Sequence, residues 1–255
     1  MNPILSAFNI RKEFGGLTAV NDVTLDVYEG RIQSLIGPNG AGKTTIFNLI
    51  TGFSPLTSGK IRFFGKRIEG KSPYKLVSMG IARTFQNVRL FENMTVLENV
   101  MLGRHARSGC TMLGSAFRFP WVLKEERSIR ENAMAELRFV GLENRAGEQA
   151  GSLPFGEQRT LEIARALATE PKLILLDEPA AGLNTHETQK IADLIQQIRE
   201  HRGITVFLVE HDMSLVMDIS DHIMVLNYGE KIAEGTPREI QNDPLVIGAY
   251  LGEEL

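Results

Sequence analysis

The chain has 255 residues, of which 43% are hydrophobic and 23% charged, a balance typical of a globular protein with a sizeable core. Its formal net charge of −3 gives no overall electrostatic attraction to nucleic acid. We therefore do not expect nucleic acid to be a partner of this protein. No apolar run approaches the roughly 20 residues of a membrane-spanning helix, and the first residues lack the layout of a signal peptide. The single cysteine, Cys110, cannot form an internal disulfide, so a cytoplasmic setting is expected.

Short apolar runs that favour strands alternate with helical patterns along the chain, which predicts an α/β fold. The continuously apolar runs suit central strands whose two faces are both covered. In chain order, the candidate strands are residues 32–36, 60–64, 173–176, 205–209 and 222–226. The candidate helices begin at Lys43, at Thr95 and near Pro154, and a further one runs through residues 187–200.

Residues 87–168 show helical patterns and few strand signals, and they predict a helical subdomain inserted into the α/β fold. Two capping boxes mark helix starts, because Thr95 is followed by Glu98 and Thr236 by Glu239. We expect one domain over residues 1–255. It comprises an α/β core at residues 1–87 and 169–228, the helical subdomain at residues 88–168 and a C-terminal tail at residues 229–255.

A glycine-rich stretch follows the first candidate strand and fits the pattern G-x-x-x-x-G-K-[ST]. Glycines allow backbone conformations closed to other residues, so successive N–H groups can converge on phosphate oxygens. The helix that follows directs its positive end at the same anion. Lys43 adds a positive charge for the β- and γ-phosphates, and Thr44 offers a hydroxyl to Mg²⁺. The stretch predicts a site for ATP with Mg²⁺, and it consists of Gly37, Pro38, Asn39, Gly40, Ala41, Gly42, Lys43 and Thr44.

An acidic pair, Asp177 and Glu178, follows the apolar run 173–176. A buried strand delivers such residues to its C-terminal end, where ligands bind in open α/β sheets. Asp177 is a candidate ligand of Mg²⁺ through water, and Glu178 is placed to polarise the attacking water as general base. Acidic pairs are also common at solvated strand ends, so this prediction depends on the phosphate loop.

With these two motifs in place, the sequence resembles the ATP-binding cassette (ABC) family over nearly its whole length. The resemblance implies a P-loop, RecA-like α/β core with an antiparallel β subdomain and an inserted helical subdomain. It implies that Gln86 senses Mg²⁺ and the γ-phosphate, that His211 is the switch histidine at the γ-phosphate, and that Phe14 packs against adenine. The implied catalytic residues are Glu178, His211, Gln86 and Lys43, and the implied metal-binding residues are Thr44, Gln86 and Asp177. The implied ATP-binding residues are Phe14, Gly37, Pro38, Asn39, Gly40, Ala41, Gly42, Lys43, Thr44 and Thr45.

Two further stretches resemble the parts of the family that reach a second cassette. One is the loop that contains Gly182, Leu183 and Asn184, in which asparagine stands where the family usually has aspartate. The other is the signature, which usually reads Leu-Ser-Gly-Gly-Gln. Here Pro154 replaces the serine and so removes a hydroxyl and a backbone N–H. The signature residues of this chain are Leu153, Pro154, Phe155, Gly156, Glu157 and Gln158.

A narrower resemblance, to the ATPase subunits of branched-chain amino-acid importers, is carried by residues 82–103, 178–184 and 210–213. The altered signature is typical of one of the two ATPases of such a system, the larger. The resemblance implies import of leucine, isoleucine or valine, driven from the cytoplasmic face of the cell membrane. The implied partners are integral membrane permease subunits, a second ATPase that is either identical or different, and an extracytoplasmic substrate-binding protein.

Four alternatives remain open from the sequence. One is an importer ATPase for another amino acid or a small amide. Another is a soluble ABC ATPase of DNA repair or translation, although the chain has neither a long coiled-coil insertion nor a second cassette. A non-hydrolysing nucleotide-binding module conflicts with the intact Lys43, Asp177 and Glu178. A small-molecule kinase could use the phosphate loop, but the positions of Gln86 and His211 would then match the ABC family only by coincidence.

Two segments suggest contacts with a membrane partner. An apolar surface between Gln86 and Glu98 predicts a docking site for a membrane subunit, and it contains Val88, Leu90, Phe91 and Met94. Residues 99–124 hold no Asp or Glu, and they predict a segment close to the membrane subunit or to anionic lipid, although a solvated loop is an equal alternative. The basic and large aromatic residues of that segment are Arg104, Arg107, Arg118, Lys124, Phe117, Phe119 and Trp121.

Overall fold

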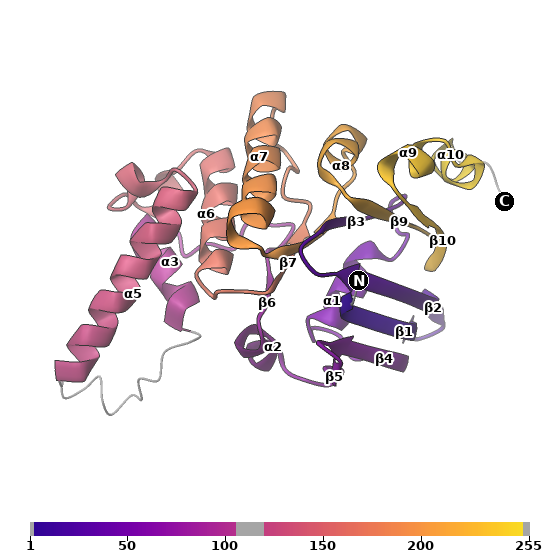
Figure 1. Ribbon diagram of the computed structural model, residues 1–255, viewed down its shortest axis with the longest axis horizontal. Helices are drawn as coiled ribbons and strands as arrows, with labels where there is room; N and C mark the ends of the chain where they lie inside the picture. Colours follow the sequence, from indigo (N-terminus) through magenta and orange to yellow (C-terminus); the bar gives the residue numbers. More distant parts are fainter. Residues whose placement is uncertain (1–2, 106–119, 252–255) are drawn as a thin grey trace.

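The computed structural model describes residues 3–105 and 120–251, and it contains two β-sheets with helix α1 (Lys43–Ile50) between them (Figure 1). The centre of the basic segment expected at residues 99–124 lies outside the described residues, so that hypothesis stays a prediction. Among the described residues, no helix is both long enough and apolar enough to cross a membrane.

The smaller sheet is antiparallel, as the resemblance implied, and has the strand order β2-β1-β4-β5. Its long strands β1 and β2 were not predicted, because bulges break their alternation of apolar and polar residues. Register shifts interrupt the β1–β2 pairing, and Asn9 and Asp22 have φ values of 46° and 54°. Candidate strand 60–64 is shifted, since Phe64 lies in a turn with a φ of 46°. The strands are β1 (Pro3–Phe14), β2 (Leu17–Tyr28), β4 (Ser58–Phe63) and β5 (Lys66–Arg67).

The larger sheet has six strands in the order β10-β9-β3-β8-β7-β6, all parallel except the edge strand β10. The predicted strands at residues 32–36, 173–176, 205–209 and 222–226 are confirmed here. Every residue of β3, β7 and β8 is buried, as expected of continuously apolar central strands. The strands are β3 (Ile32–Ile36), β6 (Ile81–Arg83), β7 (Leu173–Asp177), β8 (Thr205–Val209), β9 (His222–Asn227) and β10 (Glu230–Gly235).

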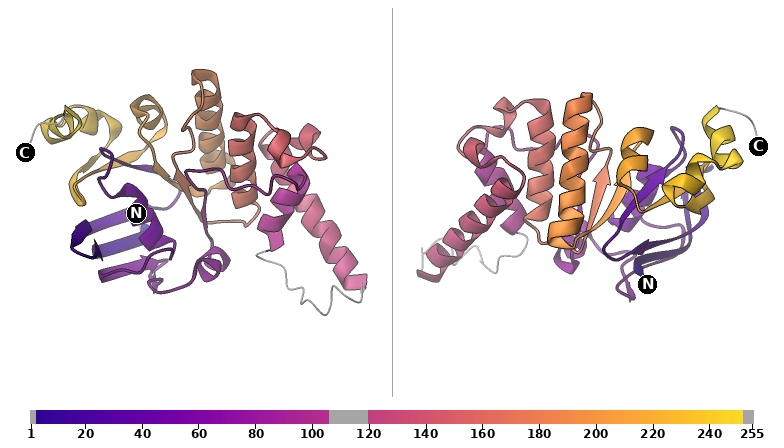
Figure 2. Two further views of the ribbon diagram at one scale, coloured as in Figure 1. Left: turned by 180° about the vertical axis from the view of Figure 1, so that it is seen from behind. Right: turned by 45° about the horizontal axis from the view of Figure 1, so that its top comes forward.

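Helices cover both faces of the larger sheet. On one face α1 packs between the two sheets, where the rings of Phe47 and Phe207 lie 5.1 Å apart. On the opposite face lie α7 and α8, with α9 and α10 over β9 and β10 (Figures 1 and 2). The capping box of Thr236 and Glu239 begins α9, as predicted. These helices are α7 (Thr185–Arg202), α8 (Met213–Ile219), α9 (Pro237–Gln241) and α10 (Pro244–Leu251), and α2 (Pro73–Met79) lies next to β6.

A third group of helices packs around its own apolar cluster beside the central sheet (Figure 1). Thr95 caps the first of them with Glu98 in the predicted capping box, in which the Glu98 N–H donates to Thr95 Oγ1 at 3.1 Å. Helix α6 joins this group to the core, because its Ile163 and Leu167 pack under α7. The helices are α3 (Val96–His105), α5 (Pro120–Phe139) and α6 (Phe155–Leu167), with short 3-10 turns at Glu143–Arg145 and Ala150–Ser152.

The close approach of α3 and α6 generates a stability prediction. A Cβ atom added at Gly103 would lie 2.2 Å from the carbonyl oxygen of Arg165, which is backbone and cannot swing away. We therefore expect Gly103→Ala to lower the free energy of unfolding by about 1–3 kcal/mol. The control is Gly147→Ala, since nothing lies within 4 Å of a Cβ atom there. Chemical denaturation measures both variants, and equal stabilities would contradict the close packing.

Candidate functional site

The candidate site lies where four parallel strands end side by side. β3, β8, β7 and β6 are neighbours in that order, so their carboxyl ends share one edge of the sheet. This edge is the usual place for ligands in open α/β sheets. The phosphate loop follows β3, His211 follows β8, the acidic pair ends β7, and Gln86 follows β6. Residues far apart in the sequence are thereby brought together.

The phosphate loop packs closely against neighbouring backbone. Gly37 has a φ of 147°, and a Cβ atom there would lie 2.1 Å from the carbonyl oxygen of Leu226. Gly42, the N-cap of α1, has a φ of 104°, and a Cβ atom would meet the carbonyl oxygen of Ala19 at 2.6 Å. Glycine is required at both positions. A Cβ atom would collide with the neighbouring carbonyl oxygen, and residues with a side chain rarely adopt these positive φ values. The loop can thus present its N–H groups at the start of α1, where the helix dipole favours an anion.

Lys43 lies folded over the loop that precedes it. Its Nζ donates to the carbonyl oxygens of Gly37 at 2.7 Å and Pro38 at 3.0 Å. Burial lowers the pKa of Lys43, whereas the nearby carboxylates of Glu178 and Asp177 act in the opposite direction. These carbonyl bonds hold the ammonium group at the loop, where phosphate oxygens can compete for the same donors.

Asp177 is buried at the end of β7 and forms an ion pair with Arg83. Arg83 Nη2 lies 2.8 Å from Asp177 Oδ2, and the two side chains are only 5% and 2% exposed. Burial raises the pKa of Asp177, while the hydrogen bond and charge of Arg83 act to lower it. Asp177 Oδ1 has no hydrogen-bond partner, which is costly for a buried carboxylate oxygen. This free oxygen fits a ligand of Mg²⁺ or of its bound water, with the exposed Thr44 offering a hydroxyl.

Glu178 lies between two other predicted site residues. Gln86 Nε2 donates to Glu178 Oε2 at 2.8 Å, and His211 Nδ1 lies 3.7 Å from the same oxygen. The Glu178 N–H donates to the Val209 carbonyl at 2.8 Å, which fixes the end of β7 against the end of β8. The φ of Glu178 is 49°, a left-handed conformation uncommon for this residue type and often found at functional sites. Together these contacts aim one carboxylate at the centre of the strand edge.

Two charged residues with buried side chains organise this edge and were not predicted from the sequence. Arg83 holds Asp177 and also donates to Asn48 Oδ1 and Thr51 Oγ1 of the α1 region at 2.8 and 2.9 Å. Glu210 is fully buried and accepts hydrogen bonds from the N–H groups of Ala180 at 2.8 Å and His211 at 3.0 Å. Burial raises the pKa of Glu210, while these bonds lower it. The sequence signal was weak, since Glu210 directly precedes His211 and Arg83 lies three positions before Gln86.

The signature stretch lies apart from the phosphate loop of its own chain. Pro154 is the N-cap of α6, with φ −54° and ψ 150°. The Phe155 ring lies over the Arg159 guanidinium at 5.2 Å and close to Gly182 of the loop after Glu178. In the described part of the chain, no hydrogen bond or ion pair joins residues 153–158 to residues 37–45.

The remaining predicted residues have well-defined surroundings. Phe14 is 50% exposed at the end of the β1–β2 hairpin, and Lys12 Nζ lies 4.6 Å from its ring centroid. The β2 backbone of this hairpin approaches Gly42 of the phosphate loop at Ala19. Asn184 is the N-cap of α7 in a full capping box with Glu187. Its oxygen accepts two backbone N–H groups, a role that aspartate would also fill.

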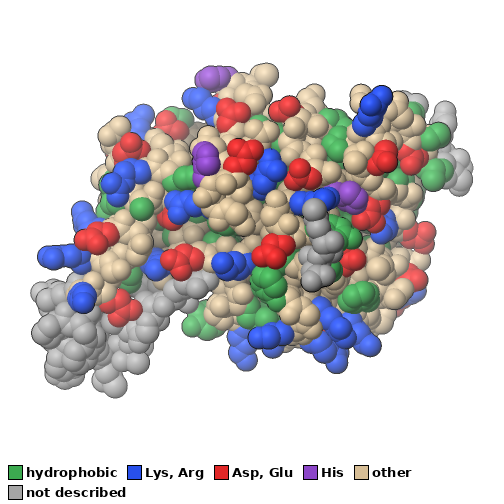
Figure 3. All heavy atoms as spheres, in the orientation of Figure 1, with side chains coloured by type: hydrophobic (Ala, Val, Ile, Leu, Met, Phe, Trp, Pro, Cys, Tyr) green, Lys and Arg blue, Asp and Glu red, His purple; other side chains and the backbone are tan. Residues whose placement is uncertain are grey.

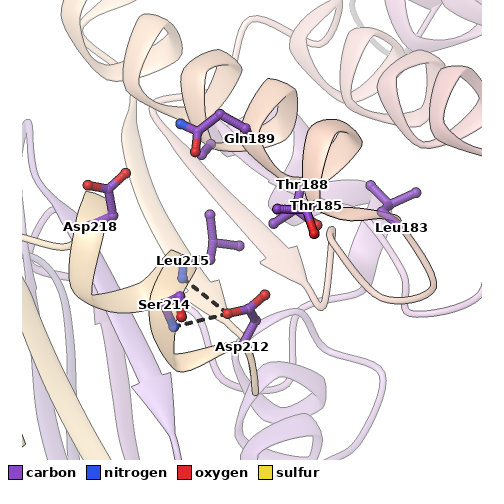
Figure 4. A pocket seen from close by; sticks show the side chains of 9 residues that line it. Leu183, Thr185, Thr188, Gln189, Asp212, Ser214, Leu215 and Asp218 are labelled. Atoms are coloured by element: carbon purple, nitrogen blue, oxygen red, sulfur yellow. Dashed lines mark hydrogen bonds between the residues drawn. The ribbon is translucent and has the colours of Figure 1, made fainter.

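A groove of 540 Å³ opens between the N-terminal ends of α7 and α8, next to this site (Figure 4). Asp212 borders it, and its carboxylate accepts the N–H groups of Ser214 and Leu215 at 3.0 and 3.2 Å. Asp212 is thus engaged as the N-cap of α8. The groove contains neither the phosphate loop nor Glu178, so the candidate nucleotide site follows from the strand-end geometry and not from this cavity.

Comparisons with known proteins agree with this geometry. Residues 20–181 match the family model described as ABC transporter, and residues 230–255 match the model described as branched-chain amino acid ATP-binding cassette transporter. The chain is 49% identical over 251 residues to the high-affinity branched-chain amino acid transport ATP-binding protein BraF of Pseudomonas aeruginosa. It is 46% identical over 251 residues to LivG of Escherichia coli, which bears the same description. Both alignments cover 98% of each chain.

Solved structures give the same result. A nucleotide-free ATP-binding cassette from an ABC transporter is 38% identical, with a TM-score of 0.85 and coverage of 98% of this chain and 99% of that one. A cassette in its ADP conformation is 37% identical, with a TM-score of 0.86 and coverage of 99% and 100%. A dimeric cassette with bound ADP and phosphate is 28% identical, with a TM-score of 0.77 and coverage of 92% and 99%. This chain therefore belongs to the ABC transporter family, as one of its ATP-binding cassettes.

Proposed function

We propose that this chain is the ATP-hydrolysing subunit of an importer for branched-chain amino acids, and that it acts on the cytoplasmic face of the membrane. The observation that carries the proposal is the convergence of the phosphate loop, Asp177, Glu178, His211 and Gln86 at four neighbouring strand ends. This arrangement is suited to phosphoryl transfer, in which the protein supplies positioning and electrostatic stabilisation.

ATP would bind across the loop at residues 37–45, with adenine against the exposed ring of Phe14. Lys43 is already held at the loop, and on binding its Nζ would exchange the carbonyl oxygens of Gly37 and Pro38 for phosphate oxygens. Thr44, Gln86 and Asp177 would hold Mg²⁺, which supplies charge neutralisation on the phosphates. The ion pair with Arg83 keeps Asp177 in place and leaves Oδ1 free for this role.

Hydrolysis requires that Glu178 be released from Gln86. In the present structure the Gln86 amide donates to Glu178 Oε2. A water molecule at the γ-phosphate would take the place of that donor, so that Glu178 accepts its proton as it attacks. His211, 3.7 Å from the same oxygen, would orient the water and the γ-phosphate. The Gln86 side chain is then free to turn toward the metal.

A second cassette completes the site. The signature residues lie at the N-terminus of α6, away from the phosphate loop of the same chain, and helix N-termini attract phosphate. The loop of residues 182–184 lies beside the Phe155 ring, so both stretches would face the partner together. ATP then bridges the pair, and hydrolysis removes the bridge. The second cassette is either another copy of this chain or a related ATPase.

The substrate assignment comes from the relatives, which are described as branched-chain amino acid transport proteins over nearly the full length of this chain. The match at residues 230–255 bears the same description. The transported molecule does not touch this subunit, so only the assembled complex can test it. Copurification of permease subunits from membranes, followed by ATP-dependent uptake of leucine, isoleucine and valine in proteoliposomes, tests the proposal. Preferential uptake of another amino acid or a small amide would redirect it, and a purely soluble complex would contradict it.

A groove bordered by Arg83 and Phe91 is the proposed docking site for a permease subunit. It has a volume of 290 Å³, opens between α2, α3 and α6, and is lined by Val77, Phe91 and Leu102 among others. Phe91 is 57% exposed, an unusual position for a large apolar side chain. Leu90, expected on the same surface, packs instead against the apolar cluster of α3, α5 and α6. Of the two neighbouring residues, Phe91 is therefore the one that offers an exposed apolar side chain to a permease subunit.

We expect Glu178→Gln to bind ATP but to hydrolyse it about 10²–10⁴ times more slowly, because the amide keeps the shape and cannot accept the proton. Fluorescent ATP binding and phosphate release measure the two effects separately. Glu131→Gln, on the exposed face of α5, is the control and should match the wild type. Near-normal hydrolysis by Glu178→Gln would remove this residue from the role of base.

We expect Pro154→Ser to raise ATP turnover or ATP-dependent pairing several-fold, because it adds a backbone N–H and a hydroxyl at the start of α6, where a partner's γ-phosphate is proposed to bind. Pro154→Ala is the matched control, since it adds the N–H without the hydroxyl. Turnover by the purified complex and size-exclusion chromatography with ATP measure the change. Equal behaviour of both variants and the wild type would show that neither donor matters.

We expect Phe91→Glu to uncouple transport, so that basal ATP hydrolysis persists while amino-acid uptake falls by about tenfold or more, because the ring is exposed at the groove and a carboxylate in its place would have to be desolvated on contact with a permease subunit. Leu245→Glu, at a similarly exposed position on α10, is the control. Proteoliposome uptake and ATPase activity are measured on the same preparations. Normal assembly and transport by Phe91→Glu would place the docking site elsewhere.

A further inference from the structure

One edge of the smaller sheet concentrates positive charge. Residues 58–75 contain six basic residues and a single acid, Glu69, and so carry a formal charge of +5. Since the whole chain has a net charge of −3, the remainder carries −8. The charges are therefore segregated within one molecule. The six basic residues form what we call the basic edge, which consists of Lys60, Arg62, Lys66, Arg67, Lys71 and Lys75.

The fold directs these side chains outward. In β4, Ile61 and Phe63 are buried, so the alternation of a strand places Lys60 and Arg62 on the exposed face. Strand β5 continues the edge, with Arg67 paired to Arg62 across the two strands. Figure 3 shows Lys and Arg gathered along the lower border of the molecule, under β4, β5 and α2. The like charges face solvent instead of forming a buried network.

Two exposed aromatic residues belong to the same region. Phe64 is 47% exposed in the turn between β4 and β5, and Tyr74 is 71% exposed on α2. Of the six cations, Arg67 forms an ion pair with Glu69 at 2.6 Å, and Arg62 lies 6.0 Å from the ring centroid of Phe8. Basic residues mixed with exposed aromatic rings are a combination suited to the membrane–water interface.

The basic edge borders the groove proposed for the permease subunit. Val77 of α2 lines that groove, and Lys75 and Tyr74 are exposed on the same helix. A permease subunit seated in the groove would place the bilayer on this side of the cassette, a step that rests on the proposed function. The edge would then face the cytoplasmic leaflet, whose anionic lipids attract basic segments.

We propose that the basic edge is a docking surface for anionic lipid headgroups. The cations are spread along a projecting border of strands, a turn and a short helix, and this matches a broad, flat field of negative charge. Long lysine and arginine side chains can reach headgroups at varying depth while their backbone stays outside the bilayer. The contact would orient the cassette and add avidity to its hold on the permease.

The test uses the full purified chain without permease, so that it is independent of the docking groove. The probes are phosphatidylcholine vesicles with and without about one-third phosphatidylglycerol, and bound protein is measured by flotation. We expect binding to the anionic vesicles alone, with release at about 0.5 M salt through screening. Lys66→Glu combined with Lys75→Glu should weaken binding about tenfold or more. The matched control, Lys190→Glu with Arg238→Glu, makes the same change in net charge at exposed positions on α7 and α9.

Each outcome decides the proposal. Loss of binding in the basic-edge variant with retention in the control supports it, provided that circular dichroism and ATP hydrolysis show both variants to be folded. Equal loss in the two variants would assign binding to net charge and overturn a specific surface. Absence of wild-type binding would also overturn it. If the wild type failed to bind anionic vesicles and the basic-edge variant failed to assemble with permease subunits in detergent, the basic edge would instead contact an acidic protein segment. The uptake assay with Phe91→Glu tests the docking groove. Its outcome does not affect the vesicle-binding result, because the vesicle assay contains no permease.

Discussion

The buried ion pair between Arg83 and Asp177 is the constraint on which the nucleotide site depends. Arg83 belongs to β6 and Asp177 to β7, and the same guanidinium bonds Asn48 and Thr51 at the end of α1. Removing one member of a buried pair leaves an uncompensated charge, which is strongly destabilising. The pair therefore fixes the acidic strand end relative to the helix that follows the phosphate loop. It uses one carboxylate oxygen for this purpose and leaves the other for the ligand.

A second layer of polar contacts links the strand ends of the candidate site to one another. Glu178 joins the Gln86 segment to the His211 loop, and Glu210 joins the His211 loop to Ala180. A change at the γ-phosphate that draws Glu178 toward water would break the bond to Gln86. The Gln86 segment leads directly to Phe91 and the groove beside α3. A short physical connection thus runs from the candidate nucleotide site to the proposed permease contact.

The signature stretch is connected to the same centre from the other side. Phe155 rests near Gly182 and over Arg159, whose guanidinium donates to the carbonyl oxygens of Phe85 and Ala181. Arg159 is therefore a bridge between the Gln86 segment and the loop after Glu178. A partner nucleotide that contacts the start of α6 would act on both segments at once. The start of α6 in this chain carries Pro154 and Phe155, where the usual signature has the small residues serine and glycine.

The local motifs of this protein could be read from its sequence, because each is a contiguous pattern with a local cause. The phosphate loop follows a strand and precedes a helix, and the central strands are continuously apolar because both faces are covered. Strands β1 and β2 could not be read, since bulges disturb their alternation, and β6 has only three residues. The roles of Arg83 and Glu210 depended on the tertiary structure alone. Their partners lie 94 and 30 residues away, and only the parallel order of β3, β8, β7 and β6 brings them into contact.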